Sequence, residues 1–263
     1  LEWCQETGIG MVTLWLLATD NLHRHDDELQ PRLGIITDVV EDLAAPDRAQ
    51  QDRIVGCLDL PREPTTTPVG SPRPPRLFWQ INDGTWDLLG FEHLDGRPAD
   101  YRPQSDDLPL VAEAIITLSG VRAPVDLELK HIEQRLADYI DDPADAGLLR
   151  GETLLHTDWH PDNVLIVDNA ARVVDWAWPT RGAAWIDAAC WVVWLTSAGH
   201  TPADAEQWAA KTPSWSTAPR RALDVFATAQ ERLWAGIAAD APDIAWIQDL
   251  AAAASQWAAY RRP

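Results

Sequence analysis

The sequence predicts an α+β fold, in which a mainly helical C-terminal part carrying a β-hairpin follows a few strands and a small α/β fragment. Two short β-prone runs, Val164–Val167 and Arg172–Val174, flank the turn residues Asp168–Ala171 and predict the hairpin. Beyond Ile186 the apolar residues recur mostly at helical spacing. The chain has 263 residues, 46% of them hydrophobic, which is enough for one large domain or two small ones.

The α/β fragment is predicted within the first sixty residues. The continuous apolar run Met11–Leu17 is interpreted as a buried parallel strand, and Asp26–Leu43 as the helix that follows it. Prolines then recur through Pro61–Pro75, where they fix φ and remove backbone donors. This stretch is predicted to be an extended linker between the fragment, residues 1–60, and a second domain, residues 76–263.

The second domain begins with two β-like runs, Arg76–Ile81 and Thr85–Phe91, separated by a turn at Asn82–Gly84. The next segment, Glu92–Gly96, is predicted to join two lobes. Helices are expected wherever apolar residues then recur every three or four positions. These ranges are Leu108–Leu118, Leu127–Ile140, Ile186–Ser197, Pro202–Ala210, Pro219–Ala239 and Pro242–Tyr260.

One polar motif borders the predicted hairpin on both sides. His156-Thr157-Asp158-Trp159-His160-Pro161-Asp162-Asn163 precedes it, and Val173-Val174-Asp175-Trp176 closes it. Because the two ends of a hairpin lie together, Asp158, Asn163 and Asp175 are expected to converge. Phosphoryl transfer needs such a set, with one carboxylate to orient or deprotonate the acceptor hydroxyl, and an amide oxygen and a second carboxylate to hold magnesium. The alternative is that these residues only cap backbone groups at turns.

The motif resembles the catalytic and metal-binding loops of the aminoglycoside phosphotransferase and choline kinase group. That family usually has His-Gly-Asp-Leu-His-Pro-Gly-Asn, followed by Ile-Asp-Trp-Glu. This chain has Thr157 and Asp162 where glycines are usual, and Ala177 where an acid is common. The resemblance covers about Leu77 to the C-terminus. It implies a protein-kinase-like C-lobe, mainly helical, preceded by a reduced N-lobe.

The same resemblance implies a role for each motif residue. Asp158 is the expected catalytic base, with His156 in support, and Asn163 and Asp175 are the expected ligands of Mg²⁺. ATP is the expected second cofactor, and its adenine would contact the backbone of the segment joining the lobes. The cofactor-binding residues expected in that segment are Glu92 and Leu94.

Asp187 has two open interpretations. In Trp185-Ile186-Asp187-Ala188-Ala189 it matches a family aspartate that braces the catalytic loop. It could equally be the N-cap of the helix that follows, because Asp is favoured at that position.

The N-terminal fragment resembles a different family, the cis-prenyltransferases that make polyprenyl diphosphates. Thr19-Asp20-Asn21-Leu22-His23-Arg24-His25 is similar to their Ser-Thr-Glu-Asn-Trp-x-Arg-Pro motif, and Arg53–Leu60 is similar to their next strand. The resemblance, over about Leu1–Pro61, implies that Asn21 and Arg24 lie near prenyl substrates. The family's upstream diphosphate loop and downstream arginine motif are absent from this sequence, so prenyl transfer is not expected.

The N-terminal part also lacks two features that a kinase-like site needs. No lysine precedes Lys130, and no glycine-rich strand–turn–strand precedes Leu77. Each lost charge-assisted contact to the phosphates is worth roughly 1.5–3 kcal/mol, so weak Mg–ATP binding is expected. Two functions remain open: a phosphotransferase for a small-molecule hydroxyl, with impaired activity, and a non-catalytic, degenerate kinase-like binding protein. The chain could also be a fusion remnant of a polyprenyl diphosphate synthase and a phosphotransferase, or the product of a truncated gene.

Charge further restricts the partners. The formal net charge is −20 and there are only two lysines, which argues against nucleic acid as a ligand. An acidic surface would attract a cationic acceptor such as an aminoglycoside or a choline-like molecule, or it only maintains solubility. Three widely spaced cysteines indicate reduced thiols and a cytoplasmic location. No apolar run reaches the ~20 residues of a membrane span. The sequence gives no expectation for the oligomeric state.

Overall fold

The structure is a computed structural model that describes residues 12–14, 75, 77–82, 87–92, 94–125, 129–176 and 178–262. By its internal contacts the chain divides into two compact units. The first unit comprises residues 1–66, 73–95 and 174–177, and the second comprises residues 67–72, 96–173 and 178–263. One boundary therefore falls within the segment predicted to join two lobes.

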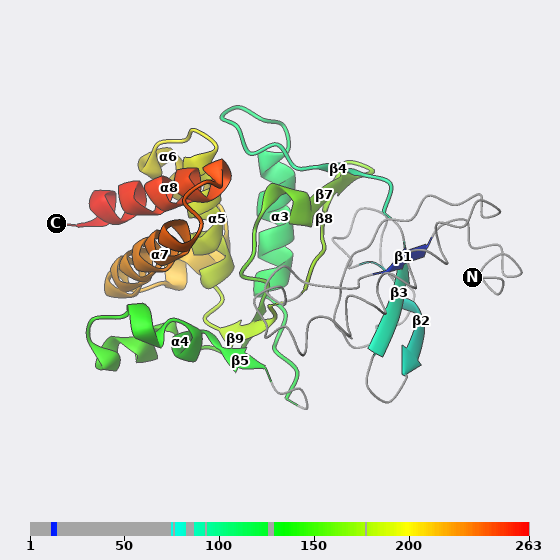
Figure 1. Cartoon of the computed structure of the whole chain (residues 1–263), viewed down its shortest axis with the longest axis horizontal. Coiled ribbons are helices and arrows are strands. Elements are labelled where there is room, and N and C mark those ends of the chain that lie inside the picture. Colours follow the sequence, from blue (N-terminus) through cyan, green and yellow to red (C-terminus); the bar gives the residue numbers. More distant parts are fainter. Residues whose placement is uncertain are drawn as a thin grey trace, which may run out of the picture. The chain divides into compact units, whose positions relative to one another are not determined.

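In the described residues of the first unit, three strands form an antiparallel sheet in the order β1–β3–β2 (Figure 1). Its strands are β1 (Val12–Leu14), β2 (Leu77–Asn82) and β3 (Asp87–Glu92). β2 and β3 pair over most of their length, so the two predicted β-like runs are confirmed. The turn expected at Asn82–Gly84 lies mostly outside the described residues.

The expectation of a parallel strand in the N-terminal fragment is wrong. β1 pairs antiparallel with β3, and Val12 lies opposite Glu92. A continuous apolar run indicates burial on both faces of a strand, but it carries no information about direction. The helix expected over Asp26–Leu43 and the linker Pro61–Pro75 lie outside the described residues, except for Pro75.

The second unit contains two small sheets. The first has the antiparallel order β4 (Arg97–Pro98), β7 (Val164–Val167), β8 (Ala170–Val173). The second has the order β5 (Lys130–His131), β9 (Thr180–Gly182), β6 (Thr153–Leu155), with β9 parallel to β5 and antiparallel to β6.

The predicted hairpin is β7–β8, with a shorter turn than expected. Val164 pairs with Val173 and Val167 with Ala170, so only Asp168 and Asn169 form the loop. Both have positive φ, 49° and 59°, as in the type I′ turns that match the twist of two-residue hairpins. Asp and Asn tolerate this conformation well, so Ala170 and Ala171 are free to join the strand.

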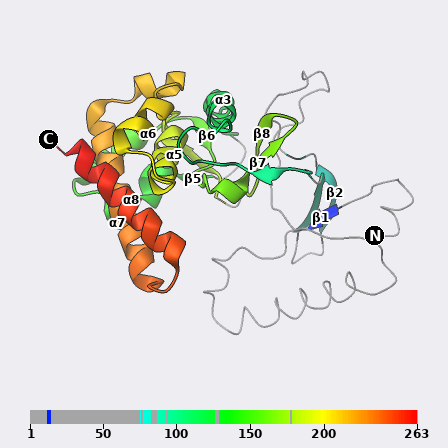
Figure 2. The same ribbon diagram turned by 90° about the horizontal axis from the view of Figure 1, so that it is seen from above.

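The helices of the second unit surround α5 (Figure 1, Figure 2). α7 packs against α8 and α8 against α5, while α3 packs against β8, β6 and α5. The α-helices are α3 (Leu108–Ser119), α4 (Ile132–Arg135), α5 (Ile186–Ser197), α6 (Pro202–Ala209), α7 (Arg220–Asp240) and α8 (Ala245–Arg261). The 3₁₀ helices are η2 (Ala137–Tyr139), η3 (Pro143–Leu149), η4 (Pro161–Asn163) and η5 (Pro213–Thr217).

Five of the six predicted helices are confirmed within a few residues, and the helix expected over Leu127–Ile140 is wrong. Its described part contains β5, the single turn of α4, and η2. Ile132, Leu136 and Ile140 are all buried, and their spacing of four residues is what suggested a helix. Pairing of β5 with β9 overrides that periodicity.

The core of the second unit centres on α5. Every residue from Ile186 to Thr196 is buried, because helices cover this helix on several sides. In the part of the chain that the structure describes, no helix combines the length and the apolar character needed to cross a membrane.

Candidate active site

The candidate site is built around the loop between β6 and η4, residues 156–160, called here the motif loop. A buried carboxylate holds the start of this loop. Asp187 accepts hydrogen bonds from two consecutive backbone N–H groups, that of His156 through Oδ2 at 3.0 Å and that of Thr157 through Oδ1 at 2.8 Å. Asp187 is only 2% exposed, so these bonds are shielded from water.

The geometry decides between the two interpretations of Asp187. Trp185 is the N-cap of α5, and Asp187 is the second residue of the helix. Its carboxylate braces the motif loop instead of capping its own helix. Burial raises the pKa of Asp187, while hydrogen bonding by the backbone of Thr157 and His156 opposes that rise.

Thr157 occupies a conformation that is unusual for its residue type. Its φ is +67°, in the left-handed region that a β-branched side chain rarely adopts. The resembled family has glycine here, and glycine adopts this conformation without a steric cost. Thr157 therefore introduces strain of about 1–3 kcal/mol beside the expected base.

Arg135, at the end of α4, contacts this strained residue. Its Nη1 donates to Thr157 Oγ1 at 3.0 Å and to Thr180 Oγ1 at 2.5 Å. Arg135 was not among the residues expected at the site. A threonine where the resembled family has glycine indicates that another residue must stabilise the loop backbone. The sequence does not show which residue does so, because Arg135 lies 22 residues away.

The structure places His156 and Asp158 in contact through the backbone. His156 is 1% exposed, and its Nδ1 accepts from the Asp158 N–H at 3.3 Å. The Asp158 side chain is half-buried, and its Oδ1 accepts a long bond of 3.4 Å from the His160 N–H. No salt bridge to Asp158 occurs among the described residues. The half-buried side chain is partly accessible to solvent.

Asn163 lies at the end of η4, directly before β7. Its Nδ2 donates to the backbone oxygen of Asp158 at 3.4 Å, which ties the two expected site residues together. This orientation leaves Oδ1 as the atom that can hold a cation. The 3₁₀ turn itself is capped by His160, whose Nδ1 accepts from the Asp162 N–H at 3.1 Å.

Asp175 is the second residue after β8 and belongs to the first unit, whereas Asp158 and Asn163 belong to the second. Its φ of 61° is a left-handed conformation that Asp tolerates. Within the described residues no group of three or more His, Cys, Asp or Glu side chains could enclose a metal. Mg²⁺ does not require one, because it usually takes one or two protein ligands and completes its shell with water and phosphate oxygens. Asn163 and Asp175 each carry a side-chain oxygen of the kind that Mg²⁺ accepts, and their shared role stays a prediction.

The two residues expected to contact the nucleotide lie near the end of segment 73–95. Glu92 ends β3, and Leu94 is half-buried in the segment that follows. Both belong to the first unit. Their role in adenine binding stays a prediction.

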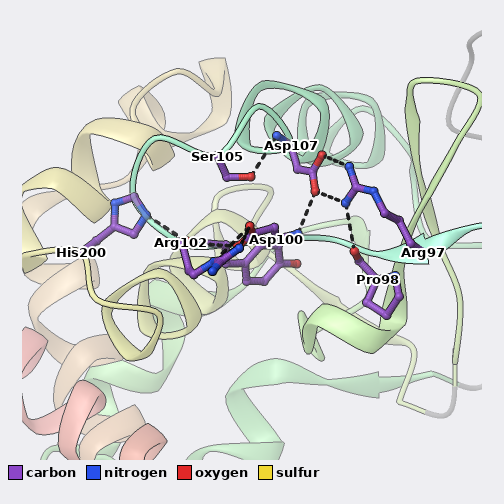
Figure 3. Close-up of polar contacts among 8 residues, drawn as sticks. Arg97, Pro98, Asp100, Arg102, Ser105, Asp107 and His200 are labelled. Carbon is purple, nitrogen blue, oxygen red and sulfur yellow. Dashed lines mark hydrogen bonds and ion pairs between the residues drawn. The ribbon is translucent and has the colours of Figure 1, made fainter.

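The connection from β4 to α3, residues 99–107, is held by polar contacts with Arg97 and among its own residues (Figure 3). Arg97 donates to both oxygens of Asp107, at 2.5 and 2.7 Å, and the Asp100 N–H donates to Asp107 Oδ2 at 2.8 Å. These bonds fix the backbone around Tyr101, whose carbonyl oxygen lies 2.9 Å from His200 Nε2. The Tyr101 ring is buried, and its pKa is raised first by burial and then by the charge of Asp158.

A group of aromatic side chains borders the far side of the motif loop. The His160 ring packs edge-on against Trp194 at 4.8 Å and Trp246 at 5.7 Å between ring centroids. Trp234 contacts both tryptophans. Trp246 is 48% exposed, so this group reaches the surface beside His160. The sequence analysis did not bring these residues to the site, because they lie on three different helices.

Comparison with known proteins finds two separate similarities. No model of a known protein family matches it. About 60 residues at the N-terminal end are similar to prenyl-transferring enzymes. They are 53% identical to the short-chain Z-isoprenyl diphosphate synthase of Mycobacterium leprae and 52% identical to the (2Z,6E)-farnesyl diphosphate synthase of Mycolicibacterium smegmatis. Each match covers 23% of this chain and 23% of the relative, so the chain spans about a quarter of the length of these relatives.

Among solved structures, the aminoglycoside phosphotransferase APH(4)-Ia is similar to this chain with a TM-score of 0.43 and 16% identity. The match covers 72% of this chain and 78% of that one. Both resemblances predicted from the motifs are thus found by comparison. The structural similarity is remote, and the argument for the site therefore rests on the chain's own residues.

Proposed function

We propose that this chain is a phosphotransferase that moves the terminal phosphoryl group of ATP to a hydroxyl group of a small molecule. The observation that carries the proposal is the arrangement of Asp158. Its half-buried carboxylate lacks a cationic partner among the described residues, while Asp187 and His156 fix the backbone on which it stands. A carboxylate used only for structure would be expected to have such a partner or a strong cap.

In this proposal Asp158 orients the acceptor hydroxyl and takes its proton. His156 is a positioning residue, because its buried ring accepts a hydrogen bond from the Asp158 backbone. Asn163 and Asp175 hold magnesium, which neutralises phosphate charge when it is bound. Glu92 and Leu94 contact the adenine through their backbone.

The acceptor is proposed to be a hydroxyl-bearing organic cation of the aminoglycoside or choline type. The formal net charge of −20 would draw such a molecule to the protein. The exposed face of Trp246 beside the motif loop adds an aromatic surface on which a cation or an apolar ring can rest. The protein is proposed to work in the cytoplasm.

A second candidate is a binding protein of the same ancestry that transfers no phosphoryl group. The observation that favours it is the absence of any lysine before Lys130, because a phosphate-binding lysine normally supports transfer. A fusion remnant that includes part of a polyprenyl diphosphate synthase is consistent with the N-terminal similarity. Prenyl transfer by this chain is not proposed.

One experiment separates the two candidates. The purified chain is incubated with magnesium and ATP labelled at the terminal phosphate, together with a panel of aminoglycosides and choline. We expect label to appear on one acceptor, and the signal to disappear when EDTA removes the magnesium. Calorimetric binding of Mg–ATP without any transferred label, across the whole panel, would support the binding protein and contradict the phosphotransferase.

A further inference from the structure

We infer that Arg135 is a positioning residue of the site, which holds Thr157 in its left-handed conformation and thereby fixes the backbone that carries Asp158. The claim that Arg135 affects phosphoryl transfer rests on the proposed function. The claim that Arg135 holds Thr157 does not, since it concerns contacts within the second unit.

The first step is the conformational cost. A left-handed β-branched residue persists only where the surrounding contacts over-determine it. Thr157 is hydrogen-bonded through its backbone and its side chain: its N–H donates to Asp187, and its Oγ1 accepts from Arg135 Nη1 at 3.0 Å. The hydroxyl also lies 3.4 Å from the Trp178 carbonyl oxygen, to which it donates. The backbone of Thr157 is therefore held by a residue later in the sequence, Asp187, and its side chain by an earlier one, Arg135.

The second step is the rigidity of Arg135 itself. Its Nη1 also donates to Thr180 Oγ1 and to the Trp178 carbonyl oxygen at 3.3 Å. Thr180 is fully buried at the start of β9, and the register pairs it with Leu155 at the end of β6. The guanidinium thus lies where the strand leading into the motif loop meets β9.

The third step is what Arg135 connects. Leu155 leads directly into the motif loop, and Trp178 directly follows the segment 174–177, which carries Asp175. The Arg135 guanidinium carbon lies 5.4 Å from the centre of the Trp178 ring, close enough for a cation–π contact. One side chain therefore contacts the loop of the expected base and the chain end of the segment that carries an expected metal ligand.

The inference has a specific consequence. If Arg135 acts by holding a strained threonine, a glycine at position 157 should make the arginine less necessary, because glycine needs no support at positive φ. The four proteins to compare are wild type, Arg135→Met, Thr157→Gly and the double variant. Arg150→Met serves as a matched control, since Arg150 is largely exposed and bonds to Glu133 outside the motif loop.

The measurement is amide hydrogen exchange of Thr157 and Asp158 relative to amides of α5. Arg135→Met should accelerate exchange of the two loop amides about tenfold or more, as expected for losing hydrogen bonds from a charged donor. In the Thr157→Gly background the same change should accelerate them less than about threefold. Arg150→Met should leave them unchanged. Equal acceleration in both backgrounds, or equal acceleration of loop and α5 amides, would overturn the inference.

A second readout addresses the catalytic meaning. Arg135→Met should lower kcat for phosphoryl transfer with little change in KM for Mg–ATP, and Thr157→Gly should recover part of kcat in the double variant. An unchanged kcat in Arg135→Met would overturn the positioning role. If the wild-type chain transfers no phosphate, the proposed function fails, and the exchange experiment alone decides whether Arg135 holds the loop.

Discussion

Two irregular segments of the second unit, the motif loop and the β4–α3 connection, are held in contrasting ways. In the connection, Arg97, Asp100, Ser105 and Asp107 bond to one another within ten residues of sequence. In the motif loop, the holding groups are Asp187, 30 or 31 residues away, and Arg135, 22 residues away. Besides these local bonds the connection has a distant contact, between His200 and the Tyr101 carbonyl oxygen, whereas the start of the motif loop is held mainly by distant groups.

The contrast extends to the carboxylates that hold the two segments, Asp107 in the connection and Asp187 at the motif loop. Asp107 bonds to Arg97, a side chain that remains 60% exposed, and the pKa of Asp107 is lowered chiefly by that hydrogen bond. Asp187 lacks a comparable arginine partner in the described part of the unit, and burial raises its pKa. The desolvated carboxylate of Asp187 bonds the backbone of Thr157, which directly precedes the expected site residue Asp158. Strain and desolvation gather at the motif loop, as is common for functional sites.

The largest expected difference is in stability. Asp187→Ala removes the acceptor of two shielded N–H groups, each of which costs about 1–3 kcal/mol when unsatisfied. We therefore expect the free energy of unfolding to fall by about 2–5 kcal/mol. Asp107→Ala should cost roughly 1–2 kcal/mol, since water can reach the Arg97 side chain that it leaves unpaired. Urea unfolding monitored by tryptophan fluorescence measures both, and equal losses would remove the proposed contrast.

The strain at Thr157 predicts a smaller effect. Thr157→Val and Thr157→Gly both delete the hydroxyl that Arg135 bonds, but valine keeps the β-branch at positive φ. Thr157→Val should therefore be less stable than Thr157→Gly by about 1–3 kcal/mol. The same unfolding experiment measures this difference. A valine variant as stable as the glycine variant would indicate that the left-handed conformation carries no strain.

The opposite pKa shifts predict opposite pH dependences. Asp107 has a lowered pKa, so its stabilising contribution is present above the unfolded value of about 3.9 and is lost as the pH falls through the folded value. Asp187 has a raised pKa, so its contribution is present below about 3.9 and is lost as the pH rises through the folded value.

Substitution by asparagine tests this difference, and we expect only small changes in the free energy of unfolding. Relative to wild type, Asp107→Asn should flatten the fall in stability on the acid side of about pH 3.9. Asp187→Asn should flatten the decline above that pH. Unfolding free energies measured from pH 2.5 to pH 7 would distinguish the two. Parallel pH profiles for the two variants would contradict the assigned directions.

The same contrast explains what the sequence could predict. The β7–β8 turn follows from two adjacent residues that tolerate positive φ, and the helices from their apolar spacing. The motif supplied Asp158 and Asn163 because they are five residues apart, and the structure links them through the Asp158 carbonyl oxygen. These features depend on short stretches of chain.

The features that could not be predicted depend on distant contacts. Arg135 reaches Thr157 only because β5, β9 and β6 form one sheet, and pairing of β5 replaced the helix expected over Leu127–Ile140. The direction of β1 depends on its partner β3. The aromatic group around His160 assembles from α5, α7 and α8, all of which are distant in sequence from the motif loop. In each case the local pattern is compatible with several outcomes, and tertiary packing selects one.

The central claim is that Asp158 serves as the base of a phosphotransferase, and a comparison within the motif tests it most directly. Asp162 is a carboxylate four residues away that is 66% exposed, so Asp162→Asn is a matched control for Asp158→Asn. The quantity to measure is the rate at which the terminal phosphoryl group leaves Mg–ATP, for acceptor or water. We predict that Asp158→Asn lowers this rate about 100-fold or more, while Asp162→Asn stays within about twofold of wild type. Equal rates for the two variants would contradict the claim.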